Sequence, residues 1–202
     1  MIIGGTSSQL RDIRLWKELI QGDDQALGQL MHVHYKALLN YGYKFVKDDE
    51  FVKDCIQDIF IDLWNSRTRV TEPDHVKAYL FVSLRRKIFR NRRKLRLTEE
   101  SNTAWNDDSQ FPVEFSPEWW LIEEETLSHK TRLVAEKLNA LPVRQREVIY
   151  LKYYQELNRE EISDILSITP QTVSNLLQLA YSTLRKHLDL SSIGLFLFIL
   201  CS

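Results

Sequence analysis

The densest positive charge in the chain lies in the twelve residues 85–96, which hold eight arginines and lysines and no acidic residue. Such a run repels itself, which favours a polyanionic partner over a merely solvated face. Tyr79, Phe81 and Phe89 are close in sequence, and rings beside cations suit the binding of unpaired bases. For Phe81 or Phe89 taken singly, core packing is the favoured interpretation. The nucleic-acid-binding candidates are Tyr79, Arg85, Arg86, Lys87, Arg90, Arg92 and Arg93.

A second candidate for nucleic-acid binding lies near the C-terminus. Asn158 with Glu161 three residues later predicts a helix start, and Thr169 before Pro170 predicts another. A short helix over 159–166, a tight turn and a longer helix over 170–188 form a helix-turn-helix plan, whose second helix can read base edges. The polar face of that helix carries Gln171, Thr172, Ser174, Asn175 and Gln178. The residues alone leave an ordinary helical hairpin with a solvated face equally open.

A third feature is a row of acidic residues on the helix predicted over 48–66. Asp54, Asp58 and Asp62 follow one another at intervals of four, with Gln57 beside them. This spacing places them on one helix face, where like charges repel by a few tenths of a kcal/mol per pair. A solvated face explains any one aspartate, whereas the whole row suits a partner rich in lysine or arginine.

The elements that carry these residues are all predicted to be helices. Apolar residues recur at helical spacing, and no stretch alternates long enough for a strand. The fold class expected is all-α, with two small helical domains joined by an acidic linker, the second containing the helix-turn-helix. The expected divisions are a helical domain at 1–97, a linker at 98–128, a second domain at 129–190 and an apolar tail at 191–202.

Charge is distributed unevenly over the same divisions, although the net charge of the 202 residues is only −1. Residues 1–96 sum to +6, residues 97–128 to −9 and residues 129–190 to +2. The near-zero total is therefore a cancellation, and it does not argue against nucleic-acid binding.

Several classes of protein are excluded by pattern. Cys55 and Cys201 are too far apart to suggest a zinc module or disulfide framework, and the five histidines form no metal-binding set. No nucleophile and base converge, so neither an enzyme nor a cofactor is expected. Nothing resembles a signal peptide, and the eight apolar residues 193–200 are too short to span a bilayer, so a cytoplasmic location is expected.

Together these motifs resemble an RNA polymerase sigma factor of the extracytoplasmic-function type, over about residues 10–188. Residues 54–64 are similar to the conserved region that docks on the polymerase clamp. Residues 78–81 and the basic run resemble the region that recognises and melts the minus-ten promoter element. The region that reads the minus-thirty-five element is resembled by three further segments: Leu141-Pro142, Arg146-Glu147-Val148 and residues 162–173.

The resemblance implies roles for the candidate residues. The polymerase clamp would be bound by Asp54, Gln57, Asp58 and Asp62. The basic run would hold the non-template DNA strand. The polar face of the last helix would contact the upstream promoter element. The implied partners are core RNA polymerase, promoter DNA and an anti-sigma factor, which in this family is often bound to the membrane. This chain departs from the family at Leu179, where a cation is common, and at Arg86 and Arg90, where amide or acidic residues are frequent.

Three hypotheses follow from the sequence. The first is a dissociable initiation subunit of RNA polymerase that recognises promoters. The second is a helix-turn-helix transcription regulator that binds duplex DNA without polymerase. The third is an interaction protein of sigma ancestry that no longer directs transcription, which the apolar residues Leu176 and Leu179 on the last helix keep open.

Overall fold

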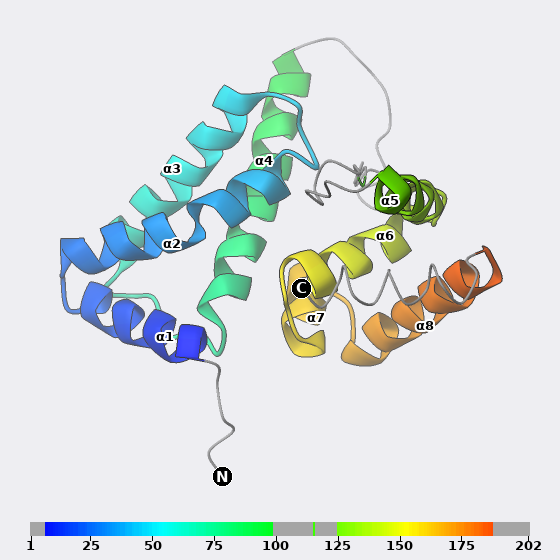
Figure 1. Ribbon diagram of the computed structural model, residues 1–202. Coiled ribbons are helices and arrows are strands. Elements are labelled where there is room, and N and C mark those ends of the chain that lie inside the picture. Colours follow the sequence, from blue (N-terminus) through cyan, green and yellow to red (C-terminus); the bar gives the residue numbers. More distant parts are fainter. Residues whose placement is uncertain (1–6, 99–114, 116–124, 188–202) are drawn as a thin grey trace. The chain divides into compact units, whose positions relative to one another are not determined.

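The computed structural model describes residues 7–98, residue 115 and residues 125–187, and within these ranges every regular element is a helix (Figure 1). This confirms the all-α class. The chain divides into two compact units, 1–103 and 104–202. Most of the expected linker and the whole apolar tail lie outside the described residues. The elements are α1 (Ser7–Ile20), α2 (Asp24–Gly42), α3 (Asp49–Ser66), α4 (Val76–Thr98), α5 (Glu125–Asn139), α6 (Val143–Ile149), the π-helical turn η2 (Tyr150–Tyr154), α7 (Arg159–Leu166) and α8 (Pro170–His187).

The first unit is built from α1 to α4, with α2 packed against all three of the other helices (Figure 1). Aspartates start two of these helices. The Asp23 carboxylate accepts a hydrogen bond from the Gln25 amide at 2.8 Å, and Asp48 accepts one from the Phe51 amide at 3.1 Å. The apolar stripes meet in a core that includes the fully buried side chains of Trp16, Leu30, Leu38, Tyr41, Ile56, Phe81 and Leu84.

One polar pair is buried inside this unit. His34 on α2 places its Nε2 atom 2.9 Å from Oδ2 of Asp12 on α1, and both side chains are buried. Arg11 binds the other carboxylate oxygen of Asp12 at 3.2 Å. Burial raises the pKa of Asp12, but the interactions with His34 and Arg11 outweigh burial and hold the pKa below its ordinary value of 3.8.

This pair predicts a pH-dependent stability of the first unit. Because the pKa of Asp12 is lowered in the folded state, its carboxylate stabilises the fold above about pH 4 and stops doing so as the pH falls further. We expect Asp12→Asn to lower the free energy of unfolding by about 2 kcal/mol at pH 7. Urea denaturation at pH 7 and pH 3 should show the difference from wild type shrinking at pH 3. An equal difference at both values would contradict this assignment.

The second unit contains α5 to α8 and has one irregular element. The α-helix α6 widens into the π-helical turn η2 after Ile149. The wider turn stacks the rings of Tyr150 and Tyr154, whose centroids are 5.6 Å apart. The ring of Phe115 also contacts Tyr154, with 5.4 Å between centroids, and the Phe115 backbone exchanges two hydrogen bonds with the Asn139 side chain. The α-helical repeat is therefore interrupted where these aromatic rings pack together.

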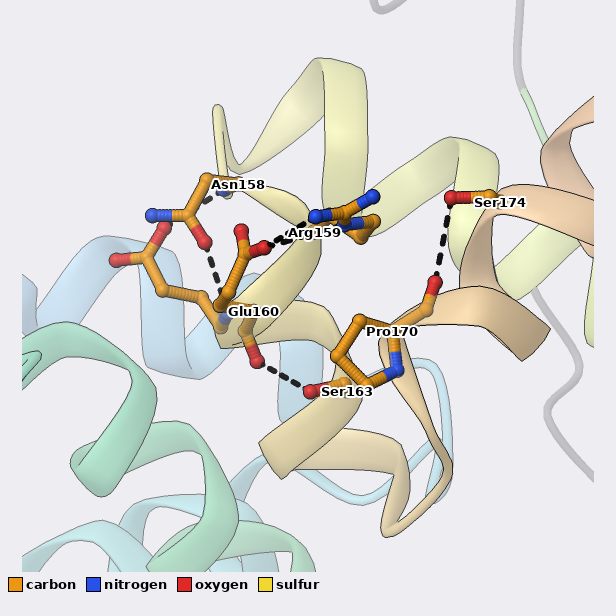
Figure 2. A network of polar contacts seen from close by, with 7 residues as sticks. Asn158, Arg159, Glu160, Ser163, Pro170 and Ser174 are labelled. Atoms are coloured by element: carbon orange, nitrogen blue, oxygen red, sulfur yellow. Dashed lines mark hydrogen bonds and ion pairs between the residues drawn. The ribbon is translucent and has the colours of Figure 1, made fainter.

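The start of α7 is fixed by a reciprocal pair of hydrogen bonds, as the sequence predicts (Figure 2). The Glu161 amide donates to Asn158 Oδ1 at 2.9 Å, and the Asn158 amide donates to Glu161 Oε2 at 2.7 Å. Leu157 and Ile162, which flank this capping box, are both buried. The helix is only eight residues long, so its stability depends on this cap and on packing.

Removing the cap should weaken α7 measurably. We expect Asn158→Ala to cost about 1 kcal/mol, seen as about fivefold faster hydrogen exchange of the amides in 159–166. Asn158→Asp, which keeps the acceptor, should exchange like wild type. Equal protection in Asn158→Ala and Asn158→Asp would show that the cap contributes nothing.

No helix among the described residues has both the length and the apolarity that crossing a bilayer requires. Within the same residues, no three His, Cys, Asp or Glu side chains are grouped so that they could hold a metal ion.

Candidate functional site

A cationic face runs along α4. Five of its side chains follow one another at intervals of four and three, so they share one side of the helix: Tyr79, Ser83, Arg86, Arg90 and Arg93. The three arginines are exposed, and Tyr79 is half-buried with its ring edge-on to Trp16 at 5.0 Å between centroids. We call these five residues the strand face, after the single strand of nucleic acid that the basic run is predicted to bind. It combines three exposed cations with an aromatic ring that packs against the buried Trp16.

The strand face borders a cleft between α3 and α4 with a volume of about 230 Å³. Ile59, Asp62, Leu63 and Ser66 line the cleft from α3. Tyr79, Leu80, Ser83, Arg86, Lys87 and Arg90 line it from α4. Two arginines beside a ring and two hydroxyls provide groups that can hold a nucleotide's phosphate and its base.

Two other arginines of the basic run are engaged inside the unit. Arg85 donates to the Tyr41 hydroxyl at 3.2 Å and lies over the rings of Phe45 and Phe89, 5.3 Å from each centroid. Arg92 donates to the Phe45 carbonyl at 3.0 Å. Both side chains are half-buried, so these guanidinium groups tie α4 to the end of α2. Phe81 is fully buried, which confirms core packing for that residue.

Lys87 has a position that the sequence did not predict. Only 8% of the residue is exposed, and its ammonium lies 2.9 Å from Asp58 Oδ2 and 3.0 Å from Asp62 Oδ2. Burial lowers the pKa of Lys87, but the bonds to the two aspartates outweigh it and hold the pKa above its ordinary value. Lys87 therefore does not project outward with Arg86 and Arg90, contrary to its expected place among the DNA contacts. We call Lys87, Asp58 and Asp62 the lysine clasp.

The clasp divides the acidic row of α3 into two parts. Asp58 and Asp62 each bind Lys87 through one oxygen, whereas Asp54 and Gln57 are exposed and have no ion pair or hydrogen bond among the described side chains. Sequence reasoning missed Ile61 on the same side of the helix, which is 48% exposed. An apolar residue beside carboxylates suits a protein partner, because such interfaces combine an apolar centre with a polar rim. The docking face is defined by five residues of α3: Asp54, Gln57, Asp58, Ile61 and Asp62.

The second unit contains the predicted pair of helices joined by a tight turn (Figure 2). α7 ends at Leu166 and is followed by Ser167, which has a left-handed backbone conformation with φ of 53°. Thr169 then accepts a hydrogen bond from the Thr172 amide at 3.2 Å, and Pro170 begins α8. α8 packs against both α6 and α7. This is the helix-turn-helix geometry in which the second helix is presented outward.

The outward side of α8 is polar at its start. Val173, Ala180 and Leu184 are buried, whereas Gln171, Thr172, Asn175 and Gln178 are exposed and Ser174 is half-buried. The Gln171 side-chain amide donates to Asn175 Oδ1 at 3.0 Å, so the two amides orient each other. The structure thus places all five predicted base-reading residues away from the core.

Comparison with known proteins agrees with this division into two parts. Residues 30–98 match the sigma-70 region 2 family, and residues 131–184 match sigma-70 region 4. The chain is 24% identical over 169 residues to the RNA polymerase sigma factor YlaC of Bacillus subtilis, covering 82% of this chain and 94% of that protein. It is 22% identical over 165 residues to the extracytoplasmic-function sigma factor SigX of the same organism, covering 80% and 82%.

Two solved structures share the fold. CnrH, determined in complex with the cytosolic domain of CnrY, aligns with a TM-score of 0.55 and 22% identity, covering 86% of this chain and 94% of its own. The sigma factor RpoE of Bartonella quintana, determined in complex with the anti-sigma factor NepR, aligns with a TM-score of 0.53 and 19% identity, covering 81% and 96%.

The chain therefore belongs to the sigma-70 family and contains its regions 2 and 4. It is an RNA polymerase sigma factor of the extracytoplasmic-function type, as the motifs predicted. The docking face and the strand face lie in region 2, and residues 170–184 of α8 lie in region 4.

Proposed function

We propose that the docking face of α3 binds core RNA polymerase, while the strand face of α4 holds the non-template strand of the minus-ten element. The observation that carries this is the opposite charge of two neighbouring helices. α3 presents exposed carboxylates, and α4 presents the exposed guanidinium groups of Arg86 and Arg90 across a shared cleft. Arg93 is exposed further along the same side of α4. One small unit can therefore bind a basic protein surface and a polyanion at the same time.

The strand face suits unpaired DNA better than duplex. The cleft beside it is lined by an aromatic ring, two serines and two arginines, and a ring can stack only on a base that has left the duplex. Stacking and charge together offset the stacking energy lost when the promoter opens. Arg85, Lys87 and Arg92 support this surface from within and are not assigned to the strand.

The second unit is proposed to read the minus-thirty-five element through the outward side of α8. Gln171, Thr172, Ser174, Asn175 and Gln178 provide the donors and acceptors that major-groove readout uses. The chain acts by binding and not by catalysis, and its place of action is the cytoplasm. Because CnrH and RpoE were determined with CnrY and the anti-sigma factor NepR, we propose that an anti-sigma factor also controls this chain.

Reconstitution with core polymerase tests the proposal. Run-off transcription from a promoter library should give specific start sites with core and chain together and none with either alone. The isolated chain should bind promoter duplex at least about tenfold more weakly than the holoenzyme does, because α8 carries few cations for phosphate contacts. Tight and specific duplex binding without polymerase would favour the stand-alone regulator, and absence of specific transcripts would refute the sigma activity.

A further inference from the structure

The outward side of α8 carries an apolar residue in line with its amides. Gln171, Asn175 and Leu179 follow one another at intervals of four, so they share one face of the helix, and 55% of Leu179 is exposed. Single exposed leucines are common on protein surfaces and imply nothing alone. Leu179 differs because it continues the row of side chains proposed to face DNA.

The hydroxyl side chains next to this row are engaged within the helix and the turn before it, which limits the groups that α8 can offer to DNA. The Ser174 hydroxyl donates to the Pro170 carbonyl at 3.2 Å, and the Thr172 hydroxyl lies 2.8 Å from that of Thr169 (Figure 2 shows the Ser174 bond). The amides of Gln171 and Asn175 are therefore the long polar groups that reach outward from the first two turns. Asparagine and glutamine amides pair well with the major-groove edge of adenine.

Charge cannot supply the affinity along this part of the helix. From Pro170 to Leu184 the sequence contains no charged residue, and the first cations are Arg185 and Lys186 in the last turn. Phosphate contacts along the first four turns must then be few and uncharged. Binding there depends on the base edges themselves, where the 5-methyl group of thymine is the apolar feature of the major groove.

We propose that Leu179 packs against thymine 5-methyl groups, so that α8 selects A·T pairs through its amides and its leucine together. This inference rests on the proposed reading of promoter DNA by region 4. Four residues advance a helix by about 6 Å, which is close to two base-pair steps of about 3.4 Å. When α8 lies along the groove, the thymine bound by Leu179 is therefore about two pairs from the adenine bound by Asn175.

The test removes one methyl group at a time from the DNA. Holoenzyme selects binding sites from a duplex library randomised at the upstream element, and each thymine of the selected duplex is then replaced by deoxyuridine, which pairs identically. We expect one or two of these replacements to weaken wild-type binding about three- to fivefold, the effect of one lost methyl contact. With Leu179→Ala the same replacements should change binding less than about 1.5-fold, because the apolar partner is already missing.

Two matched variants complete the design. Leu179→Met keeps an apolar side chain and should keep the sensitivity to deoxyuridine. Leu10→Ala removes a leucine of α1 that is 63% exposed, and it should leave that sensitivity unchanged. Two outcomes overturn the inference about Leu179 but leave the proposed reading by region 4 standing. In the first, no deoxyuridine replacement weakens wild-type binding to the selected site. In the second, the replacements weaken binding by Leu179→Ala as much as they weaken binding by wild type. A library from which holoenzyme enriches no upstream element overturns the proposed reading by region 4 and the inference with it.

Discussion

Replacing Arg86 and Arg90 together by alanine is expected to abolish promoter opening while leaving the holoenzyme intact. Both guanidinium groups are exposed, line the cleft between α3 and α4, and make no hydrogen bond or ion pair with another described residue. Two lost charge-assisted contacts of about 1.5 kcal/mol each correspond to a loss of about 100-fold in open complex. Permanganate reactivity of unpaired thymines measures the opening, and affinity for core polymerase should stay within about twofold of wild type.

Salt dependence makes this first prediction sharper. Each phosphate contact to single-stranded DNA contributes about 0.7 to the slope of log affinity against log salt, so the double variant should lose about 1.4. The control replaces Arg14 of α1 and Lys36 of α2 by alanine, which removes the same charge from elements that do not line the cleft. If the control variant lost opening equally, or if the slope did not change, the strand face would be assigned wrongly.

The second large effect is expected from reversing the charge at Asp54. This carboxylate is exposed and lies outside the lysine clasp, so Asp54→Lys changes the docking face without disturbing the core of the unit. A lysine facing a basic partner costs several kcal/mol at an interface. We expect core polymerase to be bound about 100-fold more weakly, measured by fluorescence anisotropy of labelled chain, while the melting temperature stays within about 2 °C.

Asp74→Lys provides the matched control for this second prediction. Asp74 is exposed in the segment before α4 and is not part of the docking face, so its reversal gives the chain the same net charge without changing that face. Core affinity of this control should remain within about twofold of wild type. Retained binding by Asp54→Lys, or equal losses in both variants, would refute the docking face as the polymerase contact.

The features that the sequence predicted correctly are governed by neighbours along the chain. Helix periodicity and the capping box of Asn158 and Glu161 depend on residues three or four positions apart, so the pattern itself carries the information. The outward side of α8 could be predicted for the same reason. Its buried and exposed residues alternate with the helical repeat, as Val173 and Asn175 show.

What could not be predicted depends on contacts between distant segments. Lys87 lies 25 positions after Asp62, and only the packing of α4 on α3 shows that its ammonium is turned inward. Arg85 and Arg92 bind groups of α2 and the segment after it, more than forty positions earlier in the chain. A run of cations therefore predicts that a helix binds an anion, but the fold decides which cations are available.

The lysine clasp also determines how substitutions combine. Asp58 and Asp62 share one ammonium, so their individual effects on stability should not add. Losing both carboxylates leaves a buried, uncompensated charge on Lys87, which is costly, whereas losing Lys87 leaves two exposed carboxylates that water can solvate. A chain in which Lys87 has already become methionine should tolerate later changes at Asp58 and Asp62 that the original chain would not. The order in which these three positions can be substituted is thereby constrained: substitution of Lys87 is tolerated before substitution of the two aspartates, but not the reverse.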